Sequence, residues 1–247
     1  ANMLEFLFYR RSRGVSAFFF SNTSDVILCQ RKRRVVTALP NIPYFEKEGY
    51  KTLQCVAMSK ITHPVILFVG NLKHTPNVSG LDWFLEQVWP TILEKEPGTV
   101  LQIVGNHLSN DLRIKWESFL NVDVLGFVDS LKQSYNDAWF SICPSQWGGG
   151  SNIKVLESLI MGRTCVVSEY SFKAHSPLLE DGKDLIVGRS AMSFAKGCLK
   201  LIQNRNMRQE CAESGFEKVR KECQFDGFSR KIHKTIKYVM DKNGGEK

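Results

Sequence analysis

Residues 148–157 read GGGSNIKVLE, and the residues on either side indicate how this stretch folds. The segment 140–145 before it is mainly apolar, and Leu159 and Ile160 continue an apolar helical pattern after it. The order predicts a strand, a glycine-rich turn and a helix. Glycines permit positive φ and close approach to a ligand, and the N–H groups of a first helical turn attract an anion. The candidate turn residues are Gly148, Gly149, Gly150, Ser151 and Asn152.

Two charged residues suggest what the turn binds. Lys154 falls in the first helical turn, where its charge adds to the attraction for phosphate. Glu157 lies three residues further on the same helix face and can accept hydrogen bonds from hydroxyl groups. Together they suit a nucleotide sugar, with the diphosphate at the turn and the ribose at the carboxylate. A plain glycine turn followed by a solvated Lys–Glu pair fits the same residues, so this stretch alone leaves both interpretations open.

The size and the cysteines restrict the class of protein. The chain has 247 residues, of which 43% are hydrophobic, enough for one full domain and part of a second. No apolar run approaches the roughly 20 residues of a membrane span. The start at residues 1–3 lacks the organisation of a signal peptide. Seven cysteines without CxxC spacing favour reduced thiols over disulfides or a zinc site. We therefore expect a cytoplasmic protein.

The charge is unevenly distributed. The net charge is +8, and residues 1–43 hold seven Lys/Arg against two Asp/Glu, which places +5 of it there. A basic chain can bind nucleic acid, an anionic membrane surface or an anionic substrate, or can owe its charge to solubility alone. Nucleic-acid binding is disfavoured because the basic ends lack the interleaved aromatic residues that such sites use.

From residue 65 onward, apolar strands alternate with helical patterns. We expect strands at residues 65–69, 100–104, 122–127, 140–143, 163–168 and 185–187. We expect helices at residues 78–96 (kinked or divided at Pro90), 111–120, 190–204 and 206–222, and one that ends near residue 138 and is capped by Asp129 or Ser130. Strands rich in Val and Ile that alternate with helices indicate an α/β fold with a parallel sheet covered on both faces. The prediction is a Rossmann-like, doubly wound domain.

Residues 1–63 lack this alternation. Short apolar runs at residues 18–20, 26–29 and 35–39 are candidate strands or buried segments without a complete βαβ unit around them. Pro40 and Pro43 indicate a rigid, extended connection. We interpret this part as a fragment of another unit and a linker.

The predicted strand ends meet at one edge of the sheet. Gly70 and Asn71 follow the first strand of the domain, Gly105 follows the second, and residues 148–157 follow the fourth. Ligands of doubly wound sheets bind beyond the carboxyl ends of the strands. Gly70 and Asn71 therefore join the candidate ligand-binding residues.

Other ligand motifs are missing. The segment 70–76 reads GNLKHTP instead of GxGxxG, which disfavours a dinucleotide. The chain has no GxxxxGK[ST] for a nucleoside triphosphate and no Asp-x-Asp for a metal-bridged diphosphate. The histidines have no ligand spacing, so we expect each to be an isolated surface or loop residue; they are His63, His74, His107, His175 and His233.

From residue 65 to about residue 203 the chain resembles the donor-binding, C-terminal half of a GT-B fold glycosyltransferase of the group 1 type (glycosyltransferase family 4). The motifs that carry the resemblance are, in order, FVGN (68–71), TPN (75–77), LQIVG (101–105), VLGFV (124–128), Pro144, GGGSNIKVLE (148–157), Leu159, Gly162, VV (166–167) and DG (181–182). Pro40 and Asn41 resemble the Pro-Asn that ends the linker between the two halves of such enzymes.

The resemblance assigns roles to individual residues. Glu157 matches the second glutamate of the family's Glu-x7-Glu motif, at the ribose, whereas Gly149 stands at the place of the first. The chain is similar to a subgroup with GGxxxxKxLE, in which the lysine supplies charge at the phosphates; Lys154 occupies that place. Lys73 is the nearest match to the basic residues that the family carries after the first strand of this half.

The resemblance also implies the reaction and the partners. It implies retaining, metal-independent transfer of a hexosyl group from a nucleotide-diphosphate sugar, which is a substrate, without a cofactor. The acceptor would be a glycan or a lipid-linked glycan in polysaccharide biosynthesis. The catalytic groups would come from the other half of the enzyme.

We expect three parts in the chain. Residues 1–43 are interpreted as a remnant of the acceptor domain with the linker, and residues 44–225 as the nucleotide-sugar-binding domain. Residues 226–247 form a basic amphipathic helix that, by resemblance, crosses back toward the missing acceptor domain. Such a helix also suits peripheral contact with an anionic membrane at its inner face. The alternative function is a non-catalytic module that binds a nucleotide sugar or an anion together with a partner chain.

Overall fold

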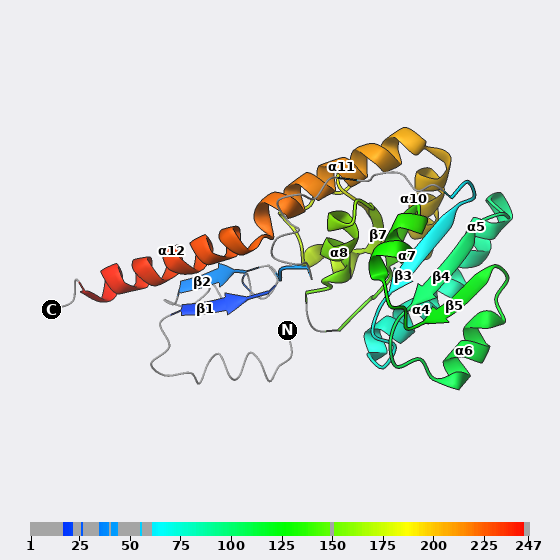
Figure 1. Ribbon diagram of the computed structural model, residues 1–247, viewed down its shortest axis with the longest axis horizontal. Coiled ribbons are helices and arrows are strands. Elements are labelled where there is room, and N and C mark those ends of the chain that lie inside the picture. The colour runs from blue at the N-terminus through cyan, green and yellow to red at the C-terminus, as the bar shows by residue number, and fades with distance from the viewer. Residues whose placement is uncertain are drawn as a thin grey trace.

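The computed structural model describes residues 17–21, 26, 35–39, 41–43, 55, 61–148 and 151–244. Figure 1 shows an α/β body, from one side of which a long helix and a short two-stranded ribbon extend. Among the described residues, no helix is long and apolar enough to cross a membrane. Each of the six described cysteines carries a free thiol.

The body is built on a parallel sheet of six strands, as predicted. The strands are β3 (Val65–Val69), β4 (Val100–Val104), β5 (Val122–Gly126), β6 (Phe140–Cys143), β7 (Cys165–Ser168) and β8 (Ile186–Gly188). Their order across the sheet is β5-β4-β3-β6-β7-β8. In the central register, Ile66 of β3 lies opposite Leu101 of β4 on one side and Phe140 of β6 on the other. The central strands are buried along most of their length, which explains why their sequences are almost continuously apolar.

Helices cover both faces of this sheet. They are α4 (Thr75–Gln87), α5 (Trp89–Lys95), α6 (Asn110–Glu117), α7 (Leu131–Asp137), α8 (Lys154–Ile160), α9 (Glu169–Lys173), α10 (Ala191–Gln203) and α11 (Arg205–Glu222). The predicted helix 78–96 is indeed divided, at Val88, and Pro90 lies in the first turn of α5. Its start was predicted too late, because α4 begins at Thr75 without a side-chain cap to mark the place. The short helix α9 was not predicted.

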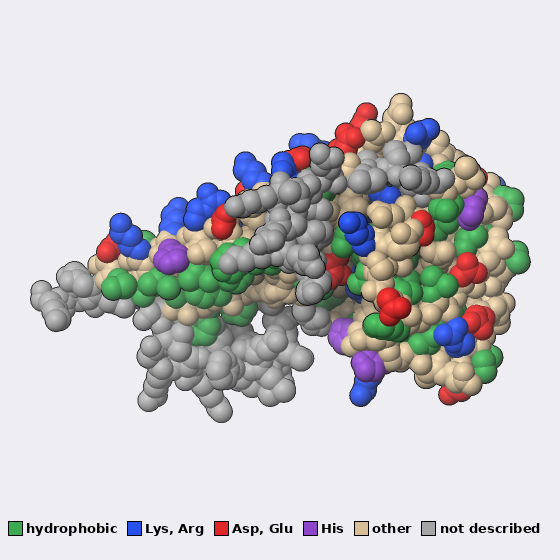
Figure 2. Space-filling view, viewed as in Figure 1, with side chains coloured by type: hydrophobic (Ala, Val, Ile, Leu, Met, Phe, Trp, Pro, Cys, Tyr) green, Lys and Arg blue, Asp and Glu red, His purple; other side chains and the backbone are tan. Residues whose placement is uncertain are grey.

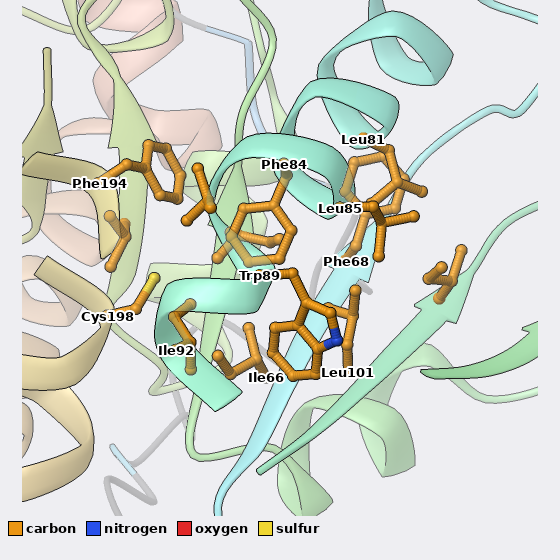
Figure 3. Packing of buried hydrophobic residues seen from close by; sticks show 14 of the residues in the cluster. Ile66, Phe68, Leu81, Phe84, Leu85, Trp89, Ile92, Leu101, Phe194 and Cys198 are labelled. Carbon is orange, nitrogen blue, oxygen red and sulfur yellow. The ribbon is translucent and has the colours of Figure 1, made fainter. Parts of the chain in front are cut away.

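The alternation of side chains along the strands places hydrophobic clusters on both faces of the sheet, three in all among the described residues. On β7, Val166 packs into one cluster, whereas Cys165 and Val167 pack into the other. The larger cluster lies under α4, α5 and α10 (Figure 3), where the rings of Phe84 and Phe194 meet edge to face at 5.7 Å. The second cluster joins the opposite face of the sheet to α8 and α11. The sheet is therefore closed on both sides, and its carboxyl edge is left for a ligand.

The long helix is α12 (Phe225–Gly244), which lies beside two N-terminal strands, β1 (Ala17–Phe20) and β2 (Val35–Ala38). These strands pair in parallel, and the hydroxyl groups of Thr37 and Thr235 lie 3.1 Å apart. Figure 2 shows basic side chains along one edge of α12 and a stripe of hydrophobic side chains beside them. Of the candidate strand 26–29, only Val26 is described, and it is helical and buried. The proposed boundaries at residues 43 and 225 remain predictions.

Candidate functional site

The site lies where the strand order reverses. β3 and β6 are neighbours at the centre of the sheet, with β4 and β5 on one side and β7 and β8 on the other. The connections from these two central strands leave in opposite directions, which opens a crevice at their carboxyl ends. Gly70 and Asn71 follow β3 at this place, and the segment 144–153 follows β6. The topology thus brings together the two segments that the sequence suggested.

A chain of hydrogen bonds crosses this switch point. Lys154, the first residue of α8, donates from Nζ to Oδ1 of Asn77 on α4 at 2.5 Å. Nδ2 of Asn77, a buried side chain, donates in turn to the carbonyl oxygen of Asn71 at 2.9 Å. The Lys154 ammonium also lies 5.0 Å from the centroid of the Phe68 ring, within the range of a cation–π contact. The lysine is therefore fixed between β3 and β6 and is not a freely solvated side chain.

Burial makes the charges of this site costly. It lowers the pKa of Lys154, although the nearby Glu157 carboxylate raises it in part. Burial raises the pKa of Glu157, and Lys154 opposes that shift. Among the described residues, no group donates a hydrogen bond to the Glu157 carboxylate. An anion near Lys154 and hydroxyl groups near Glu157 would offset these desolvation costs.

The glycine-rich loop approaches α4 closely. Gly148 has a φ of 130°, and a Cβ atom at this position would lie 2.8 Å from Cγ of Pro76. A glycine is therefore required there, for both the dihedral angle and the space. Ser151 accepts a hydrogen bond on Oγ from Nδ2 of Asn41 at 2.6 Å, which joins the loop to the segment after β2. Gly149 and Gly150 lie outside the described residues.

The residues after β3 have mainly backbone roles. Gly70 donates from its backbone N–H to Val104 at 3.0 Å and so extends the pairing of β3 with β4. The side chain of Asn71 accepts from the backbone N–H of Lys73 at 2.9 Å and closes a turn. Lys73 itself is exposed. This segment is connected to Lys154 through the carbonyl group of Asn71, which accepts the hydrogen bond from Asn77.

Three residues of the site were not predicted from the sequence. Asn77 was part of a matched motif but had no role, and only its contact with Lys154 reveals one. Tyr170 donates from its hydroxyl group to the carbonyl oxygen of Gly148, although nothing in the sequence near residue 170 indicates this. His175 was expected to be an isolated surface or loop residue. It does lie in a turn, but it is neither isolated nor at the surface, because it is 4% exposed and contacts the carbonyl group of Asn152. No local signal identifies such residues, because their partners are distant in the sequence.

The fold and the crevice define a Rossmann-like α/β domain with a ligand site at its switch point. The model of the group 1 glycosyl transferases matches residues 63–204, which is more than half of the chain. The chain therefore belongs to the group 1 glycosyltransferase family.

One curated relative is a 44.6 kDa protein in the cps region of Klebsiella pneumoniae, which is 27% identical over 179 residues. The match covers 69% of this chain and 44% of that relative. The chain thus spans less than half the length of the relative that it matches.

Solved structures share the fold. A mutant of TarM from S. aureus, in complex with Fondaparinux, alpha-GlcNAc-glycerol and UDP, matches with a TM-score of 0.73 at 15% identity, over 94% of this chain and 46% of TarM. Sucrose-phosphate synthase from Thermosynechococcus elongatus gives 0.69 at 13% identity, over 96% of this chain and 61% of the synthase. The C-terminal domain of the group 1 family protein LpcC from Francisella tularensis gives 0.50 at 14% identity, over 74% of this chain and 97% of that domain. The chain has the fold expected of the C-terminal half of a GT-B glycosyltransferase.

Proposed function

We propose that this chain binds the donor of a sugar-transfer reaction, a nucleotide-diphosphate sugar, in the crevice between β3 and β6. The observation that carries the proposal is the chain of hydrogen bonds from Lys154 through Asn77 to Asn71, with the Glu157 carboxylate beside it. In this arrangement Lys154 binds the diphosphate and Glu157 accepts hydrogen bonds from the ribose hydroxyl groups. The loop 148–152 and the segment Gly70–Asn71 supply the backbone around them.

The chemistry that we propose is retaining transfer of a hexosyl group without a metal ion. Negative charge develops on the diphosphate as it leaves the sugar, and a cation fixed in advance near that charge stabilises the transition state. Lys154 can supply this cation because α8 and Asn77 hold its amine in place. Gly149 stands where the family carries a glutamate, so this position supplies no carboxylate to the transferred sugar.

Two neighbours in fold support a nucleotide donor and a glycan acceptor. The TarM mutant structure contains UDP and alpha-GlcNAc-glycerol. The structure of HepE from Anabaena, which gives a TM-score of 0.65 at 12% identity, contains UDP and glucose. We propose a glycan or a lipid-linked glycan as acceptor. The basic residues of α12 would favour peripheral contact with the inner face of the membrane; they are Arg230, Lys231, Lys234 and Lys237.

Calorimetric titration with UDP and GDP tests the donor site. We expect the chain to bind at least one of them, and Lys154→Met and Glu157→Gln each to weaken that binding by about tenfold or more, because a charge-assisted hydrogen bond is lost. Matched controls are Lys95→Met and Glu94→Gln, an exposed pair on α5 whose side chains lie 2.9 Å apart. α5 ends near the start of β4, at the opposite edge of the sheet. Equal affinity in all four variants and the wild type would refute the site.

The pH dependence of this binding provides a second prediction. Lys154 must carry its proton to attract a diphosphate, and burial lowers its pKa. Affinity should therefore fall as the pH rises from 7.5 toward 10, and the loss should begin at a lower pH than for an ordinary lysine. Lys154→Arg, which keeps its charge throughout this range, should give a flatter profile. Calorimetry across the pH series measures the effect, and identical profiles for both proteins would contradict the role of Lys154.

The alternative function, a module that binds a nucleotide sugar without catalysis, predicts the same binding. The two functions differ in the result that they predict for a sugar-transfer assay. A complete enzyme that contains this chain and an acceptor half should release the nucleoside diphosphate only when an acceptor is present, and Lys154→Met should reduce that release. Binding without any transfer would favour the alternative.

A further inference from the structure

The end of β7 and the segment after it hold the loop after β6 at several backbone carbonyl groups. At the start of the loop, the carbonyl oxygen of Ser145 accepts hydrogen bonds from the hydroxyl groups of Ser168 and Ser171, the second at 3.4 Å. Both serine side chains are fully buried. Ser168 also caps α9, since its hydroxyl group accepts from the backbone N–H of Ser171 at 3.1 Å. The N-terminal cap of α9 therefore fixes the two serines that bind the carbonyl group of Ser145.

Two further contacts lie closer to the proposed diphosphate site. The hydroxyl group of Tyr170 donates to the carbonyl oxygen of Gly148. Nε2 of His175 lies 3.2 Å from the carbonyl oxygen of Asn152, two residues before Lys154. Burial lowers the pKa of His175 to about 4, so its ring is neutral at physiological pH and Nε2 can serve as the donor. The two contacts therefore hold the loop at its first residue, Gly148, and at its last, Asn152.

The residues that are held have unusual backbone angles. Gly148 has a φ of 130° and Asn152 a φ of 45°, both in the region that most residues avoid. A non-glycine residue in this region costs free energy unless its surroundings stabilise the conformation. The carbonyl group of Asn152 accepts a hydrogen bond from His175. It also accepts one from the backbone N–H of Val155, in the first turn of α8, at 3.0 Å. Tyr170 and His175 thus act at Gly148 and Asn152, the positive-φ positions among the described residues of the loop.

We propose that Tyr170 and His175 are positioning residues that hold Gly148 and Asn152, at the two ends of the glycine-rich loop, in the conformation that receives the diphosphate. This inference rests on the proposed function, because binding of the diphosphate is the reason for holding Gly148 and Asn152 in place. A loop that is ordered before binding avoids the entropy cost of ordering it with the ligand. Neither side chain needs to touch the nucleotide, since each acts through a carbonyl group of the loop.

Hydrogen exchange of the unliganded full chain tests the anchoring. Tyr170→Phe and His175→Leu each remove one donor, so peptides spanning residues 144–153 should exchange about fivefold faster or more. His175→Gln keeps an amide donor near the position of Nε2 and should restore slow exchange. Peptides of β3 and β4 should be unaffected, which distinguishes loosening of the loop from a general loss of stability. Unchanged exchange of residues 144–153 in both Tyr170→Phe and His175→Leu would overturn the inference.

Matched controls are Tyr238→Phe and His63→Gln, at exposed positions outside the loop. The second arm is calorimetry with UDP and GDP. Tyr170→Phe and His175→Leu should weaken binding about fivefold, whereas the controls and His175→Gln should match the wild type. Faster exchange with unchanged affinity would also overturn the positioning role.

The two arms distinguish this inference from the proposed function. If the wild type binds and exchange is unchanged, the donor site stands and the positioning role fails. If the wild type binds neither nucleotide, the proposed function fails, and the exchange measurement alone decides whether Tyr170 and His175 hold the loop.

Discussion

Gly105→Ala is expected to destabilise the protein by about 3 kcal/mol or more. Gly105 directly follows β4, and a Cβ atom there would lie 1.9 Å from the carbonyl oxygen of Gly70. That oxygen belongs to the backbone, so the clash can be relieved only by separating the ends of β3 and β4. A shift of Gly70 would also displace the adjacent Asn71 and weaken its hydrogen bond from Asn77. Urea unfolding should show the lost stability, and calorimetry should show weaker binding of UDP or GDP.

Gly98→Ala is the matched control. A Cβ atom at Gly98 would meet nothing within 4 Å, so we expect a neutral or slightly stabilising change. The comparison separates the close approach at the site from the general effect of replacing a glycine. Equal stability of Gly105→Ala and the wild type would show that the strand ends are not packed as the structure describes.

His175 is expected to make the folded state sensitive to acid. Its pKa is about 4 in the folded state because burial disfavours the charged ring, whereas an unfolded chain has the ordinary value of 6.5. Between these two values the unfolded state binds more protons, so stability is lost as the pH falls from 6.5 to 4. The shift corresponds to roughly 3 kcal/mol. Urea unfolding at a series of pH values measures it.

His175→Gln isolates this contribution. The glutamine cannot bind the proton but keeps a donor for the carbonyl group of Asn152. Carboxylates titrate in both proteins and cancel in the difference between them. The wild type should therefore lose stability relative to His175→Gln as the pH falls below 6.5, and parallel curves would show that the ring of His175 is not buried.

Much of the fold could be predicted from local patterns. The bounds of β3, β4 and β6 match the predicted strands, because strands buried on both faces require almost continuous apolar residues. The ends of α4 and the existence of α9 could not be predicted in this way. His74, at the start of α4, makes no side-chain cap, so the boundary is marked only weakly, by Pro76 in the first turn. The five-residue helix α9 is too short for an apolar periodicity to be visible.

The prediction of the site was less complete. The spacing of Lys154 and Glu157 placed both on one face of a helix that begins after the glycine-rich loop, and the structure has that helix from Lys154. The stretch 148–157 alone did not distinguish a ligand site from a solvated pair. Burial and the contact with Asn77, which is 77 positions away in the chain, favour the ligand site.

The sequence by itself determined the strand–loop–helix unit, the parallel sheet and the positions of Lys154 and Glu157, because these follow from the period of apolar residues and from the properties of glycine. Only the tertiary structure decided which residues act on them. Asn77, Tyr170 and His175 come from other connections, and the strand order brings these to the same crevice. The interactions that hold the loop are made by single polar atoms across the sheet edge, and a pattern along the chain does not encode such contacts.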